Sequence, residues 1–353
     1  LASPSDVALQ FKHAAGAGIR DERTWRRLSA NAVRALRHLK IAEVATVLDS
    51  CARASWRDDY LLCGLAEAFR CGAELRRGTV REYSLCCQSL RRLGFCPWTG
   101  TVRPIVRELR WRLKFHYWRP IDVVSVLRFA SDFKLHRLPQ VPSARALCRE
   151  LQASAERMVG DMRHLELAQF ARAVVDFSEA EGVAPDFALL ARISDNFTRR
   201  PAELETGPLL HFSSTLLRAR APASRGLAGL LSGHVKQHLV QLRPVDVTFL
   251  TMTAARLRVR DVGLLRQLAH AAASGTGSLG ARQVGRMADA FDLLGVQCPA
   301  PLLRCMEQKL VGAGEAEDPD EGPLLLALVE AATAGGRSAR VDGQALARPM
   351  ERL

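Results

Sequence analysis

The feature that most constrains the fold is a repeat of paired amphipathic segments. Apolar residues recur with a helical period along almost the whole chain, and alternating strand-like runs are scarce. Aligning the first segment of each pair places seven residues in one register: Leu48, Cys86, Leu127, Ala171, Ser213, Leu250 and Met287. The intervals between them are 38, 41, 44, 42, 37 and 37 residues. Such intervals fit two helices of roughly 12 residues each, joined by short loops.

The pattern predicts seven helix pairs. The first helices are predicted over residues 41–53, 80–93, 121–133, 165–177, 208–219, 245–257 and 284–295. The second helices are predicted over residues 58–69, 102–115, 144–158, 186–197, 225–239, 262–273 and 301–311. One pair cannot bury its apolar face alone, so neighbouring pairs must stack. We therefore predict an all-α fold, an α-solenoid of about seven helical-hairpin repeats. An irregular all-helical bundle is the alternative.

The chain divides into four expected segments. Residues 1–24 are an N-terminal extension, and residues 25–311 are the repeat array. Residues 312–323 are an acidic linker, and residues 324–353 are a C-terminal capping helix with its tail.

Positive charge is concentrated in the first part of the chain. The 353 residues carry a net charge of +13. Residues 1–150 hold 27 basic and 14 acidic side chains, whereas residues 151–353 hold 23 of each. The array is therefore expected to be basic to about residue 150 and neutral beyond it. This asymmetry favours a polyanionic partner for the first part and protein neighbours for the second. A GC-rich genome is an alternative cause of the high ratio of Arg to Lys, but it leaves the net charge unexplained.

The densest basic segment is residues 103–119, with the sequence RPIVRELRWRLKFHYWR. Four of its cations are spaced 4, 3 and 4 residues apart and share one helix face, beside a predicted apolar stripe of Val106, Leu109 and Leu113. Such a face follows a phosphate backbone, and aromatic rings among the cations are suited to stacking on unpaired bases. The alternative is a solvated face with aromatic rings packed between repeats. Together with two basic pairs near predicted helix ends, the candidate RNA-binding residues are Arg76, Arg77, Arg91, Arg92, Arg103, Arg107, Arg110, Arg112, Lys114, Arg119, Trp111, Tyr117 and Trp118.

Motifs for catalysis, cofactors and metals are not recognisable in the sequence. Gly275–Gly280 matches G-x-G-x-x-G, but a predicted helix precedes it where a dinucleotide fingerprint needs a strand. His234 and His238 are spaced as a pair on one helix face, without a Cys or acidic residue at ligand spacing. The nine cysteines form no C-x-x-C pair, which favours free thiols in a reducing compartment, with a zinc site as the alternative. We expect no enzymatic activity, cofactor, metal or transmembrane segment.

Two stretches of the chain carry a resemblance to a known family. IAEVATVLDSCARASWRDDYLLCGLAEAFR and VDVTFLTMTAARLRVRDVGLLRQLAHAAA each read as a helical hairpin. They resemble the degenerate octotricopeptide-like and heptatricopeptide-like repeats of organellar RNA-associated proteins in apicomplexan parasites and algae, which often accompany a RAP domain. The resemblance covers roughly residues 25–311, and no RAP-like segment follows them. It implies a mitochondrial or plastid protein that contacts RNA, and many such arrays are structural subunits of mitochondrial ribosomes.

Charge and resemblance together predict a non-enzymatic structural protein. We expect a subunit of a mitochondrial ribosome that binds rRNA or other structured RNA through residues 1–150 and neighbouring proteins through residues 151–353. The expected location is the mitochondrial matrix, with the plastid as the alternative, and the targeting segment is expected to be absent from this chain, which begins at Leu1 without a signal-peptide pattern. The alternatives are a protein scaffold of a respiratory or ATP synthase complex, a free organellar RNA-maturation factor and, last, an enzyme.

Overall fold

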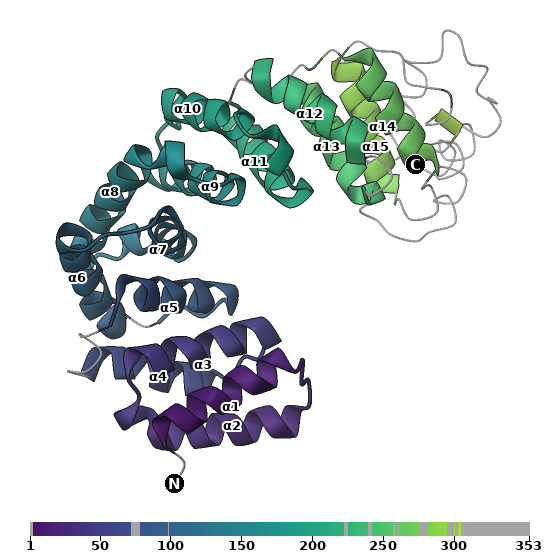
Figure 1. Ribbon diagram of the computed structural model, residues 1–353. Helices are drawn as coiled ribbons and strands as arrows, with labels where there is room; N and C mark the ends of the chain where they lie inside the picture. The colour runs from purple at the N-terminus through teal and green to yellow at the C-terminus, as the bar shows by residue number, and fades with distance from the viewer. Residues whose placement is uncertain are drawn as a thin grey trace, which may run out of the picture. The chain divides into compact units, whose positions relative to one another are not determined.

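The computed structural model describes residues 3–71, 78–97, 99–221, 225–238, 242–256, 259, 261–274, 281–294, 300 and 303–304. Within these residues the secondary structure consists of helices, without a strand, so the all-α prediction is confirmed. Figure 1 shows the helices joined by short connections. Contacts between residues divide the chain into two compact units, Leu1–Asp186 and Phe187–Leu353.

The helices of the first unit form two rows. Helices α1, α3, α5, α7 and α9 contact one another in that order, and so do α2, α4, α6 and α8. Figure 1 shows α6 and α8 on one side of α5 and α7. The α-helices are α1 (Pro4–Gly16), α2 (Glu22–Ala35), α3 (Ile41–Ala54), α4 (Asp59–Cys71), α5 (Val80–Arg92), α6 (Thr99–Phe115), α7 (Pro120–Asp132), α8 (Pro142–Arg157) and α9 (His164–Glu181). Short 3-10 helices are η1 (Leu36–His38), η3 (Leu135–Arg137) and η4 (Val159–Asp161).

The second unit repeats this arrangement. Helix α12 contacts α10 and α14, and α13 contacts α11 and α15. The elements are α10 (Phe187–Thr198), the 3-10 helix η5 (Pro201–Glu203), α11 (Thr206–Ala219), α12 (Arg225–His238), α13 (Pro244–Arg256), α14 (Val262–Ser274) and α15 (Ala281–Leu293). The helices predicted over residues 225–239, 262–273 and 284–295 thus lie within a few residues of α12, α14 and α15.

Helix boundaries follow from local chemistry. Proline occupies the first position of α7 and α8, where its missing N–H leaves no hydrogen bond unmade. The carboxylate of Asp58 accepts a hydrogen bond from the Leu61 N–H at 3.1 Å and caps α4. At the other end, Gly182 follows α9 with a φ of 70°, the left-handed conformation that ends many helices.

The aligned register coincides with the core of both units. All seven aligned residues have an exposed fraction of 1% or less, although they range in type from Leu and Met to Ala and Ser. Each lies on α3, α5, α7, α9, α11, α13 or α15. The face that the register marks is therefore the buried face of each of these helices.

The expected N-terminal extension, residues 1–24, contains a helix that packs with the rest of the first unit. Helix α1 lies within it and contacts α3, while α2 contacts α4. Val7, Phe11 and Ala14 form the buried stripe of α1, and the Phe11 ring lies 5.7 Å from the Trp25 ring. The pair α1 and α2 therefore continues the two rows of the first unit. The predicted helix over residues 301–311, acidic linker and C-terminal capping helix lie outside the described residues, apart from residues 303–304.

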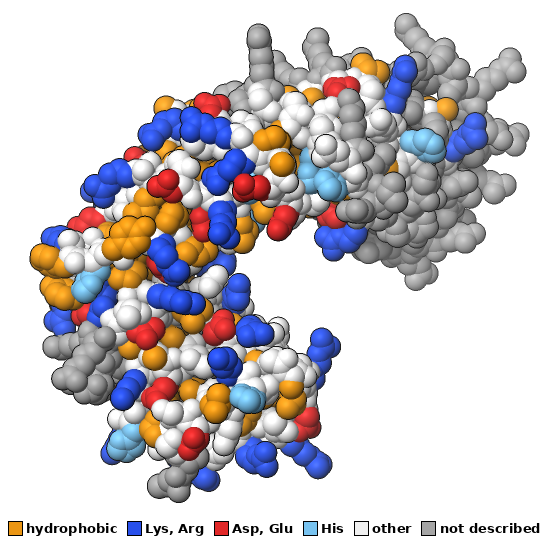
Figure 2. All heavy atoms as spheres, in the orientation of Figure 1, with side chains coloured by type: hydrophobic (Ala, Val, Ile, Leu, Met, Phe, Trp, Pro, Cys, Tyr) orange, Lys and Arg blue, Asp and Glu red, His pale blue; other side chains and the backbone are white. Residues whose placement is uncertain are grey.

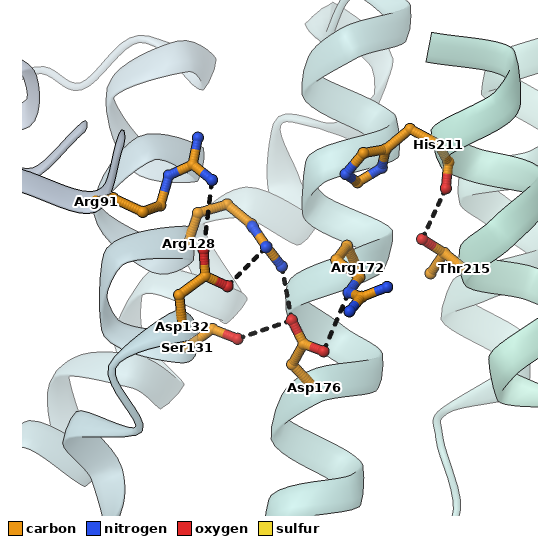
Figure 3. A network of polar contacts seen from close by, with 8 residues as sticks. All are labelled: Arg91, Arg128, Ser131, Asp132, Arg172, Asp176, His211 and Thr215. Atoms are coloured by element: carbon orange, nitrogen blue, oxygen red, sulfur yellow. Dashed lines mark hydrogen bonds and ion pairs between the residues drawn. The ribbon is translucent and has the colours of Figure 1, made fainter. Parts of the chain in front are cut away.

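A polar network joins α5, α7 and α9 (Figure 3). The Arg128 guanidinium lies between two carboxylates, 2.6 Å from Asp132 and 2.6 Å from Asp176. Arg91 of α5 reaches Asp132 at 3.3 Å, and Arg172 of α9 reaches Asp176 at 3.2 Å. Arg128 is buried and the two carboxylates are only partly exposed. The network therefore connects three consecutive helices of one row.

Removing the central cation is expected to destabilise the first unit. Arg128→Met leaves Asp132 and Asp176 close together without their shared counter-charge, which costs about 2 to 3 kcal/mol once their partial exposure is allowed for. Arg91→Met, the matched control, removes one more exposed contact and costs under about 1 kcal/mol. Urea denaturation followed by circular dichroism measures both. Equal losses for the two variants would contradict the central role of Arg128.

Candidate nucleic-acid interface

Helix α6 presents one buried face and one exposed face. Val102, Ile105, Val106 and Leu109 are buried, and α6 contacts α4 and α8. The buried stripe continues to Arg112, whereas Leu113 is only half-buried. The predicted stripe of Val106, Leu109 and Leu113 is therefore correct for its first two residues.

Two of the predicted RNA-binding residues, Arg112 and Trp118, are buried. The Arg112 guanidinium donates a hydrogen bond to the Gly78 carbonyl, pairs with Glu108 at 3.0 Å and lies 4.5 Å from the centre of the Tyr83 ring. Burial raises the pKa of Tyr83 to about 12, so this ring is a neutral phenol at physiological pH. Trp118, on the connection between α6 and α7, is 2% exposed. Both side chains therefore pack within the first unit, and their contact with RNA stays a prediction.

The exposed face of α6 borders a groove of about 750 Å³ beside the start of α8. We call it the α6 groove. Figure 2 shows hydrophobic and basic side chains side by side over α6 and α8. The residues that line the groove are Gly100, Arg103, Pro104, Arg107, Arg110, Trp111, Lys114, Phe115, Pro142 and Ser143.

The four cations predicted to share a helix face all line this groove. Arg103, Arg107 and Lys114 are exposed, and within the described part of the chain they form no ion pair. Arg110 differs, because its Nε donates to Glu150 of α8 at 3.1 Å, and this hydrogen bond raises the pKa of Arg110. Three cations are thus available to an anion along about 16 Å of helix, while the fourth fastens α6 to α8.

Two exposed aromatic rings lie among the cations. Trp111 is 50% exposed and Phe115 is 67% exposed, with 5.5 Å between the ring centres. Phe115 was not among the predicted residues. The sequence spacing could have indicated Phe115, because it follows Trp111 by four residues and side chains at that spacing are neighbours on a helix. The groove therefore combines unpaired positive charge with a pair of rings.

Tyr117 and Arg119 lie at a different place. Both border a second hollow of about 530 Å³ near the starts of α5 and α7. Tyr117 is 83% exposed. Arg119 is engaged with Asp122, with nitrogen–oxygen distances of 2.8 and 3.0 Å, and this pairing raises the pKa of Arg119. The structure does not bring these two residues into the α6 groove.

Of the paired basic sites, the described pair Arg91 and Arg92 does not line the groove. Arg91 belongs to the network of Figure 3, and its neighbour Arg92 is exposed at the end of α5. Arg76 and Arg77 lie outside the described residues. The structure thus brings together four of the thirteen predicted residues as cations, and Trp111 as a ring.

The described residues contain no cluster of three or more His, Cys, Asp or Glu side chains suited to an ion. The rings of His234 and His238 lie 4.4 Å apart, and a Thr206 hydroxyl lies 3.0 Å from His234 Nε2. Cys51, Cys87 and Cys148 are buried free thiols, and burial raises the pKa of each to about 12.

None of the described helices combines the length and apolar character that crossing a bilayer requires.

Comparison with known proteins finds no family model that matches the chain and no significantly similar curated protein.

Proposed function

We propose that this protein is a non-enzymatic structural protein that binds RNA through the α6 groove. The observation that carries the proposal is the set of three unpaired, exposed cations on one face of α6. Nearby acids are already neutralised, since Glu150 pairs with Arg110 and Glu108 with Arg112. A row of Arg and Lys side chains along a helix is suited to binding phosphate groups, and contacts of this kind position RNA without reading its sequence.

The array itself is proposed to be an α-solenoid of about seven helical-hairpin repeats, preceded by the α1 and α2 pair. The two-row contacts within each unit and the buried register support this architecture. A structural subunit of a mitochondrial ribosome is the setting that the family resemblance suggests, with rRNA on residues 1–150 and neighbouring proteins on residues 151–353. The matrix location, with the plastid as the alternative, rests on the same resemblance.

Purification of the native protein tests the proposal. At low salt we expect RNA to accompany the protein, and at high salt we expect the RNA to be lost, because each phosphate contact releases counterions. A protein scaffold would keep its partners after RNase treatment and carry no RNA. A maturation factor would retain one short RNA in place of a large structured one. Recovery of protein partners alone, without RNA at low salt, would contradict the proposal.

A further inference from the structure

We infer that the α6 groove holds an unpaired nucleotide of the RNA, with its base stacked on Trp111 beside the inclined ring of Phe115 and its flanking phosphates on Arg107 and Lys114. This inference rests on the proposed function and names the part of the RNA that the groove recognises. A single unpaired base, such as a bulge or a loop residue, is the ligand.

Exposure of the two rings is the first argument. Trp111 and Phe115 expose 50% and 67% of their surface, and they lie together inside a groove. Exposure of this apolar surface to water is unfavourable in free energy. A planar ring bound on it removes that cost. Bases within a double helix have their faces covered by their neighbours, whereas an unpaired base has a free face for an aromatic side chain. The rings therefore favour an unpaired base over a duplex.

The order of side chains along α6 is the second argument. Arg107 precedes Trp111 by four residues, Lys114 follows it by three, and Phe115 follows it by four. Residues at these spacings are neighbours on one helix face, so Arg107 lies one turn before Trp111 and Lys114 lies beside the ring pair, between Trp111 and Phe115 along the helix. A stacked nucleotide has a phosphate on each side of its sugar, and both phosphates meet a cation in this arrangement.

The walls of the groove are the third argument. Its volume of about 750 Å³ falls in the range of small-ligand sites, about 300 to 1,000 Å³. Pro142 and Ser143 of the first turn of α8 form the opposite wall, and that turn contains no acidic residue. The only described carboxylate that pairs with a groove cation is Glu150, on Arg110. The residues that line the groove include no acidic side chain that would repel a phosphate.

Two hairpin RNAs test the inference on the full-length protein. One contains a single bulged nucleotide, and the other is fully paired and has the same number of phosphates. Fluorescence anisotropy of labelled RNA measures both affinities. We expect tighter binding of the bulged RNA by about 5- to 150-fold, the range that stacking of one base supplies.

Variants assign this preference to the rings. Trp111→Ala should abolish the preference and leave the salt dependence of binding unchanged, since no cation is removed. Trp111→Phe should retain most of the preference because a ring remains. Tyr60→Ala is the matched control, since Tyr60 is 76% exposed but lies on α4 outside the groove. Circular dichroism checks that each variant is folded.

The outcomes separate this inference from the proposed function. Equal affinity of the wild-type protein for both hairpins, or a full preference in Trp111→Ala, would overturn the inference and leave RNA binding in place. A wild-type protein that binds neither hairpin would overturn both. Binding of an acidic peptide in place of either RNA would also overturn both, in favour of a protein partner.

Discussion

Replacing Arg103, Arg107 and Lys114 with glutamine is expected to lower RNA affinity by roughly 100-fold at physiological salt. The slope of log affinity against log salt should fall by about 2 to 3, because each lost phosphate contact removes about 0.7 to 0.9 from it. These three side chains are exposed and unpaired in the described part of the chain, so their loss leaves the fold intact. Anisotropy titrations at several salt concentrations measure the slope directly.

The composition of this variant follows from the structure. Arg110 is left in place, because replacing it would leave Glu150 unpaired beside the groove and would weaken the contact between α6 and α8. The matched control replaces Arg199, Arg266 and Arg286, three exposed cations of the second unit, with glutamine. It removes the same net charge. An equal loss of affinity in both variants would contradict the α6 groove and indicate attraction by overall charge.

Leu127→Asp is expected to unfold much of the first unit. Leu127 is fully buried on α7, between α5 and α9, and an aspartate there has no cation or water as a partner. Such a substitution lowers the free energy of unfolding by more than about 4 kcal/mol, a large part of the stability of a typical domain. Urea denaturation by circular dichroism measures the loss, and limited proteolysis should cut first near α7.

Leu165→Asp is the control for this prediction. Leu165 lies at the start of α9 and is 47% exposed, so its replacement adds the same charge without burying it. We expect a change within about 0.5 kcal/mol. A Leu127→Asp protein as stable as the control would show that the aligned register does not mark the core.

The helices and the register were predictable because they depend on periodicity. Residues that face the core recur every three to four positions whatever the neighbouring repeats contribute, so Leu127 and Ala171 align although their side chains differ in size. The cations of α6 followed the same rule, since their spacing alone places them on one face. Helix α1 was missed because its short stripe of Val7, Phe11 and Ala14 precedes the first complete interval.

Burial of individual polar residues was not predictable from spacing. Arg112 is buried because it contacts Gly78 and Tyr83, residues about thirty positions earlier. The sequence of α6 does not indicate those partners. Trp118 is buried on the connection between α6 and α7, whose path the helical period does not fix. The contacts of Arg112 are distant in the sequence, so the spacing of residues within α6 does not reveal them.

The charges of the polar network recur in the sequence at matching positions of consecutive helix pairs. Arg128 and Asp132 are four residues apart, and so are Arg172 and Asp176, 44 residues later. Arg128 and Arg172 each follow an aligned core residue directly. Charges that recur at one register position in consecutive repeats point to contacts between those repeats, as Figure 3 shows.

Ultraviolet crosslinking of the natively purified complex tests whether RNA occupies the α6 groove. Mass spectrometry of the crosslinked peptides locates the RNA on the chain. We expect the strongest crosslinks in the peptide that contains Trp111 and Phe115, since aromatic rings in contact with bases crosslink readily. Crosslinks confined to residues 187–353, or absent from α6 in a complex that retains its RNA, would contradict RNA binding in this groove.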